Sequence, residues 1–406
     1  MDFMVKTPLF EGGPLTLPYT HIIFRRDRSL TCPFYIPMIF RGLLLIMLLF
    51  TYPTSAQDEV DNPLPDDERH DHPWYVFLQD GEDDTSDELI FVDALTGQQT
   101  ILLVNGERFT LYDGQVMFFD TVYQQVMMAN TYGELYPHPF IQLGANHHRV
   151  DWLVSDDKSQ IAWTLAGRDA RDRLTTITTV ANIDGTNPRQ VLAETDDIGS
   201  NLRSVPVSFD DNIKTLYMGT HIDGISEHAV FQQYVSFFSL DMDSGETEMM
   251  AGETLNCICG AALQGNKFLR LRLTDDFNAF DLHIHNTKVE NSQVLAAIRL
   301  SNYETAGDIL ISPDGSKAIY ALGRVTDFGG TNEEIQTVFV LVDLDSLTQE
   351  VWTNPISTYL RPVEWTDDNS AIIFTSPDQR GTWKISLSDG RLERIADASY
   401  LGTLGE

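Results

Sequence analysis

Histidine pairs are the residues in this chain most suited to metal chemistry, because neutral imidazole is a common ligand of transition metals. His283 and His285 are two residues apart in a strand-like run, so both side chains point to one face of the strand. A metal site needs three or four converging ligands. We therefore expect surface or packed histidines, with metal binding as the alternative. The other pairs are His147 with His148 and His70 with His72.

Closely spaced acidic residues suggest calcium as a second chemistry. Asp241, Asp243 and Glu246 are near neighbours, as are Asp343 and Asp345. A calcium loop requires more oxygen ligands than these stretches offer, so we predict that the aspartates cap hairpin turns. The chain has no Gly-x-Ser-x-Gly, His-Glu-x-x-His or phosphate-loop motif. We accordingly predict a non-catalytic protein without a cofactor.

Cys257 and Cys259 are the only cysteines after residue 56. Two residues apart on a strand, they share a face, and a disulfide between them would close a very small, strained ring. We expect buried thiols here, ahead of a metal-binding or redox pair.

Repeated turns reveal the elements that must position all of these residues. Ser312-Pro313-Asp314-Gly315 separates two runs rich in β-branched and aromatic residues, as in a strand–turn–strand unit. The turn returns at Ser155, Ser208 and Thr366, and weaker copies occur at 262–269, 111–118 and 64–67. A period of about 50 residues in strand-rich sequence is typical of a β-propeller.

A second turn, built from Asp and Gly or Ser, recurs later in the units. Its copies are 93–97, 184–187, 241–245, 343–346 and 388–390. Each unit therefore contains four antiparallel strands, A to D, which is one propeller blade. We predict an all-β propeller with seven four-stranded blades, and six as the alternative. To close the ring, we favour Tyr400–Leu404 over Val60–Leu64 as the inner strand of the first blade.

The turn Ser312–Lys317, together with the later turn Asn182–Arg189, resembles the TolB-type, WD-repeat-like propeller repeat. The propeller domains of prolyl-oligopeptidase-like peptidases carry similar repeats. The resemblance covers about residues 60–400 and implies the propeller fold. Two features depart from these families. The α/β domain that precedes the repeats in TolB is not found here, and no hydrolase domain follows the repeats as in the peptidases. The envelope role of TolB is therefore an analogy only.

The N-terminal segment resembles an export signal. The apolar run 43–50 follows Arg41, precedes the small residues Thr54-Ser55-Ala56, and is shorter than the roughly 20 residues of a membrane helix. We predict a signal peptide at 38–56, a misassigned start or extension at 1–37, an acidic linker at 57–72 and the propeller at 73–406. The protein would be secreted or periplasmic, with an uncleaved membrane anchor as the alternative.

Net charge restricts the partners. The chain carries 60 acidic and 27 basic residues, a net charge of -33, which repels nucleic acid and anionic lipid. The connections between strands B and C vary most in length, and variable loops on a rigid scaffold often bind partners. These loops are expected at 80–87, 167–173, 219–233, 274–278 and 323–336. The candidate binding residues are Asp80, Asp84, Arg168, Arg171, His221, Asp223, His228, Arg324 and Asp327.

Together, these features predict an exported, monomeric scaffold that binds a protein or peptide partner. The alternatives are a propeller enzyme, such as a metal-dependent polysaccharide lyase, and a ligand-binding sensor.

Overall fold

The computed structural model describes residues 73–405 except positions 82–85, 113, 197–198, 200, 211, 213, 227–228, 254–256, 290, 328–333, 358, 367 and 378. Within this part of the chain, no helix is long and apolar enough to cross a membrane. Several predictions lie outside the described residues: the segments 1–37, 38–56 and 57–72, the turn at 64–67, the strand Val60–Leu64, the histidines His70 and His72, and the candidates Asp84 and His228.

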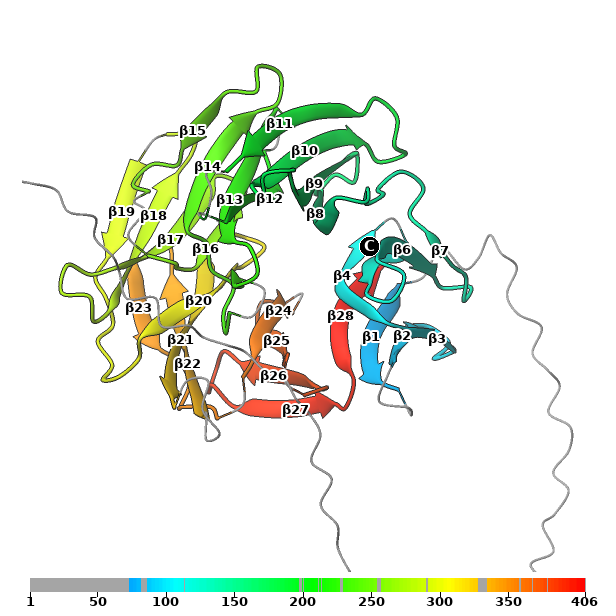
Figure 1. Ribbon diagram of the computed structural model, residues 1–406. Coiled ribbons are helices and arrows are strands. Elements are labelled where there is room, and N and C mark those ends of the chain that lie inside the picture. The colour runs from blue at the N-terminus through cyan, green and yellow to red at the C-terminus, as the bar shows by residue number, and fades with distance from the viewer. Residues whose placement is uncertain are drawn as a thin grey trace, which may run out of the picture. The chain divides into compact units, whose positions relative to one another are not determined.

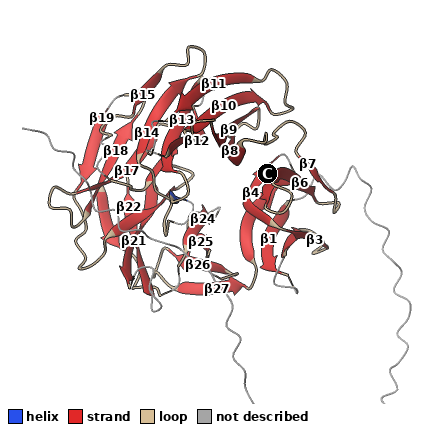
Figure 2. Ribbon diagram, in the orientation of Figure 1, coloured by secondary structure: helices blue, strands red, loops and turns tan. Residues whose placement is uncertain are grey.

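Seven four-stranded antiparallel sheets make up the described chain, which confirms the prediction of seven blades (Figures 1 and 2). Blade 1 contains β28 (Ser399–Leu404), β1 (Trp74–Asp80), β2 (Asp87–Asp93) and β3 (Gln99–Val104). Blade 2 contains β4 (Gly106–Tyr112), β5 (Gln115–Asp120), β6 (Gln125–Asn130) and β7 (Leu135–Pro137). Blade 3 contains β8 (His147–Val154), β9 (Gln160–Arg168), β10 (Leu174–Asn182) and β11 (Arg189–Thr195).

The remaining blades follow the same order along the chain. Blade 4 contains β12 (Leu202–Phe209), β13 (Thr215–Ile222), β14 (Ser236–Asp241) and β15 (Thr247–Met249). Blade 5 contains β16 (Ala261–Gln264), β17 (Lys267–Leu273), β18 (Phe280–Asn286) and β19 (Asn291–Leu295). Blade 6 contains β20 (Thr305–Ile311), β21 (Lys317–Thr326), β22 (Glu334–Asp343) and β23 (Thr348–Val351). Blade 7 contains β24 (Arg361–Trp365), β25 (Ala371–Thr375), β26 (Thr382–Ser386) and β27 (Leu392–Ala396).

Burial changes from strand to strand within a blade. The second strands are buried on both faces, as in β21, whose residues Ala318–Gly323 are all buried. Outer strands are largely exposed, as in β15. Because the sheets pack face to face around the ring, the core consists of apolar clusters between neighbouring blades, such as the one joining blades 5 and 6. The A–B and C–D turns lie on one side of this ring, the turn face. The B–C and D–A connections lie on the other, the loop face.

The A–B turns repeat one hydrogen-bond pattern. In blade 6 the Ser312 hydroxyl donates to Asp314 (2.6 Å) and accepts the Lys317 amide (2.9 Å), while Gly315 takes a φ of +68°. Thr366 of blade 7 accepts the Ala371 amide in the same way (3.0 Å). These residues are therefore turn formers, as the sequence predicts.

Blade 4 departs from the predicted register. In blades 6 and 7 a Ser or Thr hydroxyl accepts the amide five residues later. In blade 4 the carboxylate of Asp210 takes this role and accepts the Thr215 amide at 2.9 Å. A bulge between Pro206 and Ser208 shifts the pairing of β12. The prediction that Ser208 marks this turn is therefore wrong by two residues.

The tail of the chain closes the ring. β28 pairs antiparallel with β1, from Trp74 opposite Leu404 to Leu78 opposite Ser399. The prediction that Tyr400–Leu404 supplies the inner strand of blade 1 is confirmed.

Four of the five predicted loops are partly strand, since Asp80 ends β1, Asp87 begins β2 and Arg168 ends β9. β13 continues to Ile222, and β21 and β22 extend to Thr326 and back from Glu334, so His221 and Arg324 lie in strands. Gly219 and Gly323 suggested loop starts, but they are strand residues at tight contacts. A Cβ atom would lie 2.3 Å from the ring of Tyr234 at Gly219 and 2.6 Å from the ring of Phe231 at Gly323.

The prediction of free thiols is also wrong, because Cys257 and Cys259 form a disulfide. Their Cα atoms are 5.5 Å apart, which is within the normal range for a disulfide and shorter than the roughly 6.6 Å of a fully extended strand.

Candidate functional site

A cluster of charged side chains joins blades 2, 3 and 4 near the loop face. Its centre is Arg203 on β12, whose side chain is 1% exposed. One guanidinium nitrogen pairs with Asp151 of β8, and the Nε atom is 3.4 Å from a carboxylate oxygen of Asp223. His148 and Arg168 of blade 3 also contact Asp223, at 3.0 and 3.8 Å. The charged cluster is defined as Arg108, His148, Asp151, Arg168, Arg203, His221 and Asp223.

The two aspartates of the charged cluster stay ionised despite burial. Burial alone would raise the pKa of Asp151, but Arg203, Arg149 and Arg108 outweigh it and hold this pKa below its usual value. The pKa of Asp223 is also lowered, because the hydrogen bond from His148 and the nearby arginines exceed the effect of burial. The charged cluster is therefore a fixed set of opposite charges. Its electrostatic field acts on a ligand without any rearrangement of these side chains.

Arg108 extends the charged cluster onto an aromatic wall. Its guanidinium lies 3.2 Å from Asp151 and about 5 Å from the ring centres of Phe119 (5.2 Å) and Trp152 (5.0 Å). Arg108 itself has a φ of +58° at a bulge in β4, a conformation uncommon outside glycine that is enriched at functional sites. Arg108, Asp151 and Trp152 border a cavity of about 190 Å³, which His221, Gln232 and Tyr234 also line.

Residues 229–235, here called the crossing segment, leave blade 4 and contact three other blades. Tyr234 forms a bridge with Cys259 of blade 5, and the Gln232 amide donates to Asp308 of blade 6 (2.6 Å). At blade 7, Arg361 donates to the carbonyls of Ala229 and Val230 (3.1 and 3.3 Å). Gln232 and Tyr234 also line a second cavity of about 310 Å³ between the inner strands of blades 3 to 6. The predicted loop 219–233 is thus largely built into the ring.

Asp308 is a buried acid held by the crossing segment. It has a φ of +50° at a bulge in β20, and its Oδ2 atom has no hydrogen-bond partner among the described residues. Burial raises its pKa to about 6, although Arg361, 4.0 Å away, and the Gln232 amide both oppose the shift. Asp308 therefore takes up its proton in the mildly acidic range.

A buried ion pair anchors the other end of the crossing segment. Arg270 of β17 is 2.8 Å from Glu253, and it donates to the carbonyls of Tyr234 (3.1 Å) and Cys259 (2.5 Å). Both charged side chains are almost fully buried, at 3% and 0% exposure. Each charge is compensated by the other, as buried charges require.

The structure brings together three of the predicted binding residues. Arg168, His221 and Asp223 all belong to the charged cluster, where His221 lies 3.4 Å from Arg203. Other candidates lie elsewhere on the loop face. Asp80 pairs with Arg380 across blades 1 and 7 (2.9 Å). Arg171 lies in the connection that follows Arg168, whereas Arg324 on β21 and Asp327 directly after it belong to blade 6.

Sequence reasoning missed Asp151, Arg203, Asp308 and the crossing segment. A signal was present in the repeats. Asp151 and Asp308 each stand four residues before the turn hydroxyls of Ser155 and Ser312. A charged residue repeated in inner strands, where burial favours apolar residues, indicates a functional position.

The pair His283 and His285 and the acidic turn after β14 have structural partners. His283 and His285 line a cavity of about 50 Å³ with Arg270 and Arg272, whose positive charges would repel a metal cation. In the turn after β14, Asp241 accepts the Ser244 amide (2.7 Å), which confirms hairpin capping. Among the residues that the structure describes, no three His, Cys, Asp or Glu side chains are grouped as metal ligands.

Comparison with known proteins identifies the fold but not a family. No protein-family model and no curated protein match the sequence. Among solved structures, a prolyl endopeptidase superposes with a TM-score of 0.55 at 11% identity, over 82% of this chain and 51% of the other. An oligogalacturonate lyase in complex with manganese gives 0.48 at 12% identity, over 77% and 83%. A putative 6-phosphogluconolactonase from Bacteroides fragilis gives 0.44 at 12% identity, over 84% and 99%.

Such low identities carry information about fold alone. This chain spans about half of the prolyl endopeptidase chain. The protein is a seven-bladed β-propeller with structural neighbours among propeller proteins.

Proposed function

We propose that this protein is an exported, non-catalytic propeller that binds a protein or peptide partner through its loop face. The observation that carries the proposal is the charged cluster, in which side chains from three blades are fixed by mutual ion pairs near that face. Preorganised charges of both signs select a partner's register and orientation. The apolar run at 43–50 supports export.

The position of the crossing segment favours binding of a partner at the loop face over binding in an open central channel. It contacts Cys259 just before β16 and Asp308 on β20, and it reaches Arg361 at the start of β24. A partner would therefore meet the crossing segment and the charged cluster together. Arg168, whose side chain is 37% exposed, and the exposed Arg171 present positive charge at this rim.

Affinity capture with two matched double variants tests the proposal. R168Q/R171Q removes two positive charges from the loop face, and K158Q/K317Q removes two from A–B turns on the turn face. The proteins are immobilised, exposed to the cell-envelope and culture-medium fractions, and crosslinked before washing. We expect wild type and K158Q/K317Q to retain the same partner, and R168Q/R171Q to retain several-fold less.

Equal retention of the partner by both double variants would show that the loop face is not the binding surface. Failure of the wild type to retain any partner after crosslinking would contradict the binding function itself. Thermal unfolding midpoints of the variants, measured beforehand, establish that each one is folded.

A further inference from the structure

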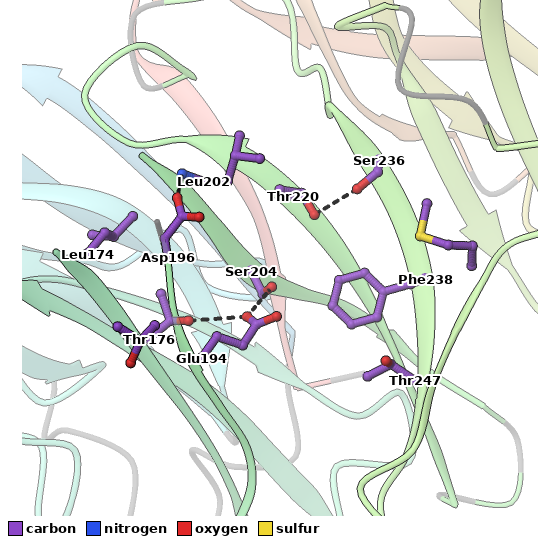
Figure 3. Close-up of a pocket in the computed structure, with 12 residues that line it drawn as sticks. Leu174, Thr176, Glu194, Asp196, Leu202, Ser204, Thr220, Ser236, Phe238 and Thr247 are labelled. Carbon is purple, nitrogen blue, oxygen red and sulfur yellow. Dashed lines mark hydrogen bonds between the residues drawn. The ribbon is translucent and has the colours of Figure 1, made fainter. Parts of the chain in front are cut away.

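A cavity of about 370 Å³ opens between blades 3 and 4, beside the charged cluster (Figure 3). Its wall comes from β10 and β11 of blade 3 and from β12 to β15 of blade 4. Two of its residues, Leu202 and Thr220, are the chain neighbours of Arg203 and His221. Neighbouring strand residues point to opposite faces of a sheet, so the cavity lies across blade 4 from Arg203 and His221, at the level of the loop-face ends of β10 to β14.

The lining of this interblade pocket is acidic and contains no basic side chain. Glu194 and Asp196 are its two ionisable groups, and the remaining lining residues are Leu174, Thr176, Thr195, Leu202, Ser204, Thr220, Ser236, Phe238, Thr247 and Met249. Ser204 and Thr176 both donate hydrogen bonds to one oxygen of Glu194, at 2.6 and 3.2 Å, and so fix its carboxylate in the pocket. A fixed carboxylate without a cationic partner in the lining favours a cationic ligand.

An aromatic ring and an apolar side chain complete the wall opposite the acid. In Figure 3 the ring of Phe238 extends toward the same space as Glu194. A cation beside an aromatic face is attracted by the ring quadrupole, and an aliphatic stem packs against apolar side chains. These features match a lysine or arginine side chain, which combines an aliphatic stem with a charged end.

A buried hydroxyl pair supplies an independent indication of a ligand. Ser236 and Thr220 are 2.8 Å apart and are 5% and 9% exposed. Only one of the two protons can lie between the oxygens, so the other hydroxyl keeps a donor with no acceptor among the described residues. Because both hydroxyls line the cavity, a ligand carbonyl there can accept the remaining proton. A peptide residue supplies such a carbonyl next to its side chain.

We infer that the interblade pocket binds a lysine or arginine side chain of a peptide segment, with its cation at Glu194 and Asp196. This inference rests on the proposed function, because it names the chemistry of the partner. The net charge of -33 favours the approach of such a basic segment over long distances.

The test uses short capped peptides on the purified protein. Acetyl-Gly-Lys-Gly-amide and acetyl-Gly-Arg-Gly-amide are titrated calorimetrically, with the norleucine peptide as an uncharged ligand of similar length. E194Q removes the pocket charge. E248Q is the matched control, because Glu248 lies on β15 between the lining residues Thr247 and Met249 and points to the opposite face.

We expect the basic peptides to bind wild type and E248Q equally, and E194Q about tenfold more weakly. Equal binding of the norleucine peptide, or equal losses in E194Q and E248Q, would overturn the inference. Loss of partner capture with R168Q/R171Q but not with E194Q would also overturn it while leaving the proposed function intact. Peptide binding as expected, without any captured partner, would support the pocket and contradict the proposed function instead.

Discussion

Asp151, Arg203 and Asp308 are charged residues in the buried inner wall of the propeller. A buried charge is costly unless it is paired, and each of these has an opposite charge within 4.0 Å. Their partners come from other blades or from distant loops, as with Arg203 and Asp151, which are 52 residues apart. The sequence shows the charges but not these pairings, because they depend on how the blades are arranged around the ring.

Replacing Asp308 with Asn tests how this buried carboxyl group affects the stability of the folded protein. Its pKa is raised from 3.8 to about 6, so the folded state binds the proton more tightly than the unfolded state does. Stability therefore falls as pH rises from about 4 to 6 and stays lower above that range. We expect D308N to raise the free energy of unfolding above pH 7 by up to about 3 kcal/mol and to have little effect near pH 4. Urea unfolding at both pH values measures the difference.

Asn retains the acceptor for the Gln232 amide, so this hydrogen bond is preserved in D308N. An equal change in stability at pH 4 and above pH 7 would show that the Asp308 charge does not cause the effect.

The crossing segment is the element that the sequence predicts least well. The sequence predicts residues 229–233 as part of a variable loop, yet Phe231 is 1% exposed and packs with the core between blades 6 and 7. Its contacts reach as far as Arg361, 132 residues away. Local propensity carries no information about such distant partners, whereas it does mark the turns, whose hydrogen bonds are local.

Replacing Phe231 with Ala tests whether the crossing segment is part of the core. Removing a fully buried phenylalanine leaves a cavity and loses apolar burial, so we expect the free energy of unfolding to fall by about 3–5 kcal/mol. The control is F277A, the same substitution at a ring that is 72% exposed, for which we expect a change within about 0.5 kcal/mol. Denaturant midpoints of both variants decide the question, and similar values would contradict a buried crossing segment.

The architecture of the whole molecule follows closely from its repeats. Seven similar units cannot bury their faces alone, so the period in the sequence predicts a closed ring, and the apolar tail supplies the closing strand. The candidate site follows less directly, since only Arg168, His221 and Asp223 among the described candidate binding residues meet in the charged cluster. Contacts between side chains of different blades depend on how the ring places the blades, and the sequence of a single repeat does not show them.

An ion pair between blades 7 and 1, beside the closing strand, contributes to the stability of the whole ring. Arg380 of blade 7 contacts Asp80 and Asp87 of blade 1, where the first and last blades meet. Because the pair is partly exposed, we expect R380Q to lower the free energy of unfolding by only about 1 kcal/mol. R391Q removes an exposed arginine from the same blade and serves as the control, with no measurable change expected. High salt should reduce the effect of R380Q, and a loss that is independent of salt would contradict an electrostatic role.

The most direct test of the proposed function is hydrogen exchange of the backbone with and without the captured partner. Binding at the loop face predicts slower exchange at residues 167–173, 202–204 and 219–223, which surround the charged cluster. It predicts unchanged exchange at residues 155–160 and 312–317 on the turn face. Protection confined to the turn face, or no protection on either face in a formed complex, would contradict binding at the charged cluster.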